Sequence, residues 1–112
     1  MLLLFDESMP RPVRRFFPDM AEIYTAQMMG WSGKKNGELM DLAAKHGFEA
    51  MITADQTIAK DSHSFEPAIP ILVLDGVRNH KADIEAVVPT LAEMLEMELG
   101  NGYHFLSDYL KA

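Results

Sequence analysis

The chain has 112 residues, a length that fits one domain around one core and excludes two independent domains. Hydrophobic residues make up 48% and charged residues 24% of the sequence, values close to globular averages, which excludes a largely disordered chain. The sequence contains no cysteine, which excludes disulfide bonds and thiol nucleophiles, so we expect a cytoplasmic protein.

The net charge of −7 disfavours nonspecific binding to nucleic acids. Residues 61–112 carry six of these seven net negative charges, so the first part of the chain is nearly neutral. Its basic residues can therefore form a small phosphate-binding patch if the fold gathers them. These residues are Arg11, Arg14, Arg15, Lys34 and Lys35. A solvated surface without a ligand is the alternative interpretation.

Four short apolar runs predict β-strands, in chain order at 2–5, 22–25, 50–53 and 69–74. The first and last of these runs are apolar throughout, as is typical of buried parallel strands. The first run is also too short for a membrane span or a signal peptide, so we expect no contact with a membrane.

Helical patterns lie between and after the strands, over 11–17, over 37–46 and from residue 81 onward. Asn36 is the expected N-cap of the second helix. Pro89 predicts either a kink in the third helix or the start of a new one. Residues 103–106 fit either an edge strand or a short helix. Because strands alternate with helices, the sequence predicts an α/β fold with a mostly parallel sheet.

Carboxylates follow three of the predicted strands. Asp6 and Glu7 come after the first, Asp55 after the third and Asp75 after the fourth. The carboxyl ends of parallel strands share one crevice, and Glu38, in the first turn of a helix, can face the same edge. Converging carboxylates repel one another unless a hard cation lies between them. The sequence therefore predicts a metal site with Asp6, Glu38 and Asp55 as ligands, the alternative being acids that only cap helices.

The expected metal is Mg²⁺ or Mn²⁺. Zn²⁺ is disfavoured because cysteine is absent and the four histidines show no ligand spacing. A hard divalent cation lowers the pKa of a bound water and neutralises charge on a phosphoryl oxygen, so phosphodiester hydrolysis is the expected chemistry. Arg11, Arg14, Lys34 and Lys35 are candidates to hold an RNA backbone without reading its sequence.

Three motifs in order, "LLLFDESMP", "GWSGKKNGELMDLAAKHGF" and "MITAD", resemble the small bacterial PIN-like proteins of the PIN ribonuclease superfamily, often encoded beside antitoxins. The resemblance covers about residues 1–98 and leaves 99–112 as a C-terminal extension. It implies a three-layer α/β/α fold and a metal-dependent endoribonuclease, the toxin of a toxin–antitoxin pair. It also implies a homodimer and an antitoxin protein as partners.

The matching positions of that family are Asp6, Glu7 and Pro10, then Glu38 and Leu39, then Thr53 and Asp55. The resemblance implies that Asp6, Glu38 and Asp55 hold the metal and catalyse. Residues expected to support the site are Glu7, Asn36, Thr53 and Asp75. The family often has an aspartate where this chain has Asn36, and a second acid where it has Gln56 and Thr57. A catalytically degenerate interaction module with a PIN-like fold is therefore an alternative.

Two further alternatives concern particular residues. A phosphorelay receiver domain would use Asp55 as its phosphoacceptor but needs a lysine after a fifth strand, and neither Lys81 nor Lys111 follows a clear strand. Trp31 packs in the core or, beside the lysines, stacks on a base. Residues 56–67, which include "DSHS", are expected to be a loop at the mouth of the crevice.

Overall fold

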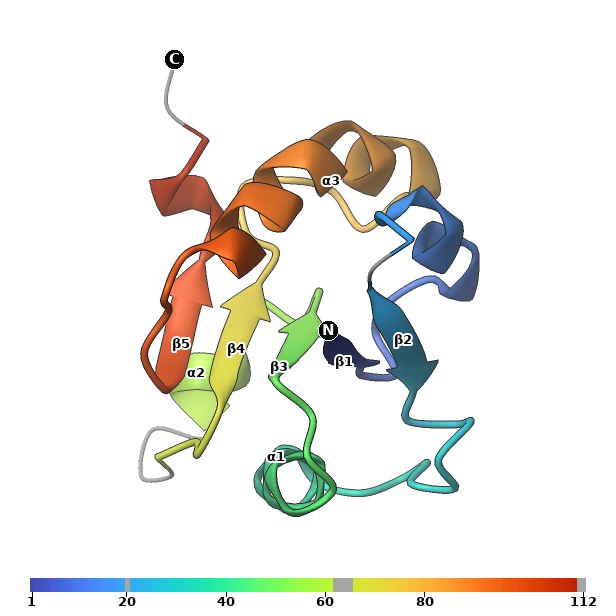
Figure 1. The fold of residues 1–112 in the computed structure, drawn as a ribbon, viewed down its shortest axis with the longest axis vertical. Helices are drawn as coiled ribbons and strands as arrows, with labels where there is room; N and C mark the ends of the chain where they lie inside the picture. The colour runs from blue at the N-terminus through green and yellow to red at the C-terminus, as the bar shows by residue number, and fades with distance from the viewer. Residues whose placement is uncertain (20, 62–65, 111–112) are drawn as a thin grey trace.

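The computed structural model describes residues 1–19, 21–61 and 66–110. Its elements are β1 (Leu2–Phe5), the 3₁₀-helix η1 (Arg11–Phe16), β2 (Glu22–Thr25), α1 (Asn36–Lys45), β3 (Ala50–Thr53), α2 (Ile58–Asp61), β4 (Pro70–Val73), α3 (Lys81–Glu96), β5 (Gly102–Phe105) and the 3₁₀-helix η2 (Leu106–Asp108). The strands form one parallel sheet in the order β2-β1-β3-β4-β5. In Figure 1, η1 and α3 cover one face of this sheet, and α1 and α2 cover the other. The predicted three-layer α/β/α fold is confirmed.

The first three predicted strands coincide with β1, β2 and β3 residue for residue, and β4 is one residue shorter at each end than predicted. The open question at residues 103–106 is resolved in favour of a strand. β5 pairs in parallel with β4, and η2 follows it directly. The apolar runs located these strands well because a strand buried on both faces must be apolar at nearly every position.

The core consists of two apolar layers, one on each face of the sheet. Leu3 and Phe5 of β1 point into the layer beneath η1 and α3, whereas Leu4 points into the layer beneath α1. All three side chains are fully buried. Because successive side chains of a strand alternate between faces, β1 supports both layers and fixes the position of whatever follows it.

One sequence prediction about the helices is narrowed by the structure, and two predictions are wrong in detail. Helix α1 begins at Asn36, so Lys35, and not Asn36, occupies the N-cap position. Helix α3 continues through Pro89, so no new helix begins there; its buried side chains, Val88 and Leu91 among them, hold the helix together where one hydrogen bond is missing. The stretch 56–67, predicted to be a loop, contains α2, which the fully buried Ile58 anchors to the core. Residues 62–65, which include most of "DSHS", lie outside the described residues.

The strand order reverses direction at one point of the sheet. The chain passes from β1 to its neighbour β2 on one side and then returns to β3 on the other side. Phe5, the last residue of β1, lies beside Thr25 of β2 and Ile52 of β3. In parallel sheets, ligands bind outside the carboxyl ends of the strands at such a reversal, here between β1 and β3.

Candidate functional site

Asp6 lies at this reversal, directly after β1, and only 6% of its surface is exposed. Its Oδ1 accepts hydrogen bonds from the backbone N–H of Ser8 (3.1 Å) and from Ser8 Oγ (2.5 Å). Its Oδ2 accepts a hydrogen bond from Thr53 Oγ1 at 2.5 Å, across from the end of β3. The backbone N–H of Asp6 also donates to the carbonyl of Ile52. Both strand ends therefore hold this carboxylate in place.

The pKa of Asp6 is raised above its ordinary value of 3.8, chiefly because burial penalises the charged form. The hydrogen bonds from Ser8 and Thr53 act in the opposite direction, and the nearby charge of Asp55 raises the pKa further. Burial wins over three donated hydrogen bonds. The ionised form of Asp6 is therefore unfavourable in this setting, and either protonation or a bound cation would neutralise its charge.

Asp55 lies two residues beyond β3 and begins the turn into α2. Its Oδ1 accepts hydrogen bonds from the backbone N–H of Thr57 (3.0 Å) and from Thr57 Oγ1 (2.7 Å). This is the local pattern by which aspartate stabilises a turn. Its own N–H donates to Thr53 Oγ1 (3.0 Å), so Thr53 contacts both acids. The Oδ2 atom of Asp55 accepts no hydrogen bond from the residues that the structure describes.

Both acids line one hollow of about 270 Å³, which we call the carboxylate pocket. Its lining residues are Asp6, Glu7, Ser8, Gly33, Lys34, Asn36, Leu39 and Asp55. Glu7 is exposed, and its Oε1 accepts a hydrogen bond from the N–H of Gly33 at 2.6 Å. Gly33 has a φ of +82°, a conformation that glycine adopts without strain. This contact holds the loop before α1 against the end of β1 and closes one wall.

The structure brings together most of the predicted site. Asp6, Asp55, Glu7, Asn36 and Lys34 all line the carboxylate pocket. Thr53, predicted to support the site, donates its hydroxyl directly to Asp6 and is itself fully buried.

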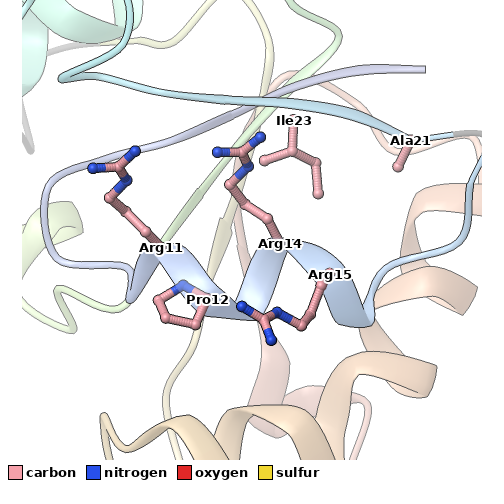
Figure 2. A pocket seen from close by; sticks show the side chains of 6 residues that line it. All are labelled: Arg11, Pro12, Arg14, Arg15, Ala21 and Ile23. Carbon is pink, nitrogen blue, oxygen red and sulfur yellow. The ribbon is translucent and has the colours of Figure 1, made fainter.

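Five predicted residues lie elsewhere. Glu38 is exposed on α1 and does not line the carboxylate pocket, and neither does Lys35. The carboxylate of Asp75 accepts hydrogen bonds from the N–H and the Oγ of Ser107 (2.8 and 2.6 Å), which fastens the turn after β4 to η2. Arg11 and Arg14 line a different hollow, between η1 and β2 (Figure 2).

The pocket's donor set fits a hard cation with few protein ligands. No group of three histidine, aspartate or glutamate side chains suited to a metal occurs among the described residues, and Glu38 lies outside the pocket. Mg²⁺ is commonly bound by only one or two carboxylates and keeps several waters. A carboxylate offers about four acceptor positions. Asp6 uses three of these within the protein, and the Oδ2 of Asp55 is open, so both retain capacity for such an ion.

Sequence reasoning missed Ser8. Its Oγ donates to Asp6 and accepts from the N–H of Ala54 (2.9 Å), so it links the ends of β1 and β3. The signal in the sequence was an aspartate followed two residues later by serine, a common turn pattern. Trp31 is 8% exposed and packs edge-on against Phe48 at 6.0 Å between ring centres, so its packing role is confirmed.

No family model, curated protein or solved structure matches this chain. The fold and the pocket therefore carry the functional argument. No helix within the described ranges is both long enough and apolar enough to cross a membrane.

Proposed function

We propose that this protein is a divalent-metal-dependent nuclease that hydrolyses phosphodiester bonds of RNA. The observation that carries the proposal is Asp6, a buried carboxylate with a raised pKa, beside Asp55 in a pocket at the reversal point of the sheet. Perturbed carboxylates in such a position are typical of functional sites.

In this proposal Asp6 and Asp55 hold Mg²⁺ or Mn²⁺, which supplies Lewis acidity and an activated water. Ser8 and Thr53 fix the orientation of the Asp6 carboxylate through their hydroxyl groups. Lys34, which lines the same pocket, balances the charge of a scissile phosphate in this proposal. Asn36 offers an amide to the same space. Glu38 acts in this site only if α1 or its side chain rearranges.

The wider biological setting is part of the proposal and rests on the resemblance of the sequence to PIN-like proteins. It comprises a cytoplasmic location, a role as the toxin of a toxin–antitoxin pair, an antitoxin protein as partner, and a homodimer.

Calorimetric titration with Mn²⁺ tests the metal site. The wild type should bind Mn²⁺, and Asp55→Asn should lose at least about tenfold in affinity. This is the lower end of the loss seen when a residue that only hydrogen-bonds to a metal ligand is removed. Asp75→Asn is the matched control, since it makes the same chemical change at another strand end and should bind as the wild type does. Absence of binding at millimolar Mn²⁺ would refute the proposal, as would equal affinity in Asp55→Asn.

Cleavage of a mixed pool of RNAs in the presence of Mn²⁺ tests the chemistry. We expect products from the wild type and from Asp75→Asn, and none when the metal is chelated. Binding of Mn²⁺ without cleavage of any RNA would instead favour the degenerate interaction module, for which the exposed position of Glu38 is the supporting observation.

A receiver-like phosphoacceptor is the second candidate. The strand order β2-β1-β3-β4-β5 is the order of that class, and β5 supplies the fifth strand whose absence had counted against it. However, the residue directly after β5 is the buried Leu106, and not a lysine; Lys111 lies outside the described residues. Incubation of the wild type and Asp55→Asn with a small phosphodonor, followed by mass measurement of the intact proteins, distinguishes the candidates. A mass increase of one phosphoryl group in the wild type that is absent from Asp55→Asn would favour the receiver.

A further inference from the structure

Helix η1 presents three arginines on one short segment. Side chains three residues apart in a 3₁₀-helix lie above one another, so Arg11 and Arg14 leave η1 on the same side. Figure 2 shows these two side chains extending in parallel from η1, while Arg15 leaves in another direction. The buried Val13 packs into the core and fixes the helix from its other side.

These arginines line the hollow between η1 and the edge of the sheet at β2, which we call the arginine pocket. It has a volume of about 340 Å³, larger than the carboxylate pocket. Its lining residues are Arg11, Pro12, Arg14, Arg15, Ala21 and Ile23. All the charged side chains in this lining are therefore guanidinium groups, although Asp19 and Glu22 are close in sequence.

The three guanidinium groups lack anionic partners within the protein. None forms an ion pair with a carboxylate in the ranges that the structure describes. Arg14 is half-buried, and its buried Nε has no hydrogen-bond acceptor among the described residues. Its Nη1 donates only to the soft acceptor Met28 Sδ at 3.3 Å. A partly buried cation with an orphaned donor is unfavourable until an oxyanion pairs with it.

We propose that the arginine pocket is a phosphate-binding subsite that holds the backbone of the RNA strand outside the carboxylate pocket. The planar guanidinium fork matches the oxygens of a phosphate group and binds them in pairs. Arg11 and Arg14, whose side chains extend in parallel, suit one dianion or two successive phosphodiesters. The assignment of RNA as the phosphate-bearing ligand rests on the proposed function. The segment that leaves β1 through Asp6 leads directly into η1, so Arg11 follows Asp6 by only five residues in the chain.

Binding of a fluorescently labelled oligouridylate in EDTA tests the subsite apart from any metal. The double variant Arg11→Gln/Arg14→Gln should bind about tenfold more weakly, and the slope of log K against log salt should fall by about 0.7 for each arginine lost. The control Lys45→Gln/Arg78→Gln removes the same charge from two residues that are already paired with Asp41 and Asp83. It should bind within twofold of the wild type. Equal loss in both double variants, or no loss in the first, would overturn the subsite.

The same assay separates this inference from the proposed nuclease. Asp55→Asn should lose cleavage yet keep RNA binding in EDTA. If no variant cleaves but binding still depends on Arg11 and Arg14, the nuclease proposal fails and the subsite stands. If cleavage occurs and the arginine variants bind RNA normally, the subsite fails and the nuclease stands.

Competitors identify the source of the anion. Tripolyphosphate should displace the oligouridylate, and polyglutamate of equal charge should do so at least about tenfold less effectively, because a phosphate group concentrates more charge and more acceptor oxygens than a carboxylate does. Tripolyphosphate that binds through the arginines while RNA does not would overturn the RNA-backbone assignment in favour of a free phosphate compound. Equal displacement by polyglutamate would overturn it in favour of an acidic protein segment.

Discussion

Two carboxylates follow apolar strands of the same parallel sheet, Asp6 after β1 and Asp75 after β4. Each accepts hydrogen bonds from a serine, through both its backbone N–H and its hydroxyl. Asp75 is partly exposed at an outer region of the sheet, whereas Asp6 is buried between two strand ends with Asp55 near it.

The difference between them shows what a strand-end acid needs in order to become a site. Asp75 links the turn after β4 to η2, and its partly exposed carboxylate is solvated by water. Asp6 is enclosed, so its charge is not relieved, and a second carboxylate shares its pocket. Burial and a neighbouring acid, rather than position after a strand, make Asp6 the candidate for cation binding.

The largest expected effect is on cleavage by Asp6→Asn. Removing a residue that only hydrogen-bonds to a metal ligand typically lowers metal affinity or activity by about 10- to 100-fold. Removing a direct ligand should therefore reduce Mn²⁺-dependent cleavage by at least about 100-fold. Asp75→Asn should leave the cleavage rate nearly unchanged. Initial rates on one RNA under saturating Mn²⁺ provide the measurement. An Asp6→Asn protein that cleaves at the wild-type rate would remove the distinction between the two acids.

Thr53→Val should lower the free energy of unfolding by about 1–3 kcal/mol, because it removes a donor from a buried carboxylate without changing the side-chain shape. Thr25→Val is the matched control on β2. The hydroxyl of Thr25 is also buried but accepts from a neutral amide, that of Met28, so its loss should cost about 1 kcal/mol or less. Urea unfolding at pH 7 measures both. A larger loss in Thr25→Val would contradict the account of Asp6.

The pH dependence of stability should carry the signature of Asp6. Because its folded-state pKa lies above 3.8, the folded state holds the proton more tightly than the unfolded state. The stability from this group is complete below pH 3.8 and is lost as the pH rises through the folded-state pKa. Asp6→Asn, which cannot ionise, should therefore unfold at a higher temperature than the wild type at neutral pH.

That difference in melting temperature should shrink as the pH is lowered toward 3.8. Thermal unfolding of the wild type and Asp6→Asn at a series of pH values is the measurement. A difference that stays constant with pH, or a wild type that is the more stable at neutral pH, would contradict the raised pKa.

The smallest expected effect is that of Ser107→Ala. The hydroxyl contact with Asp75 is lost, but the backbone N–H of residue 107 still donates to the same carboxylate. In an exposed setting this loss should cost about 0.5–1 kcal/mol. Urea unfolding measures the change, and RNA cleavage should be unaffected. A marked loss of cleavage would show that Asp75 belongs to the functional site after all.

Much of the candidate site was predictable from the sequence because its acids come directly after recognisable strands. Asp6 and Asp55 were placed together by the rule that parallel strands end at one edge. The prediction that Glu38 joins the metal site did not account for the rotation of α1 about its axis. The position of Glu38 in the first turn is clear from the sequence, but the loop before α1 decides which side chains of the helix enter the pocket. Leu39 and Asn36 line the pocket instead.

By itself, the sequence determined the α/β class, three strands to the residue and the two acids of the carboxylate pocket, since apolar runs and their ends are local patterns. Only the tertiary structure decided which polar groups meet. The bond between Glu7 and Gly33 and the enclosure of Asp6 by Thr53 join residues 26 and 47 positions apart. Such contacts depend on strand order and on loop paths, which no local pattern encodes.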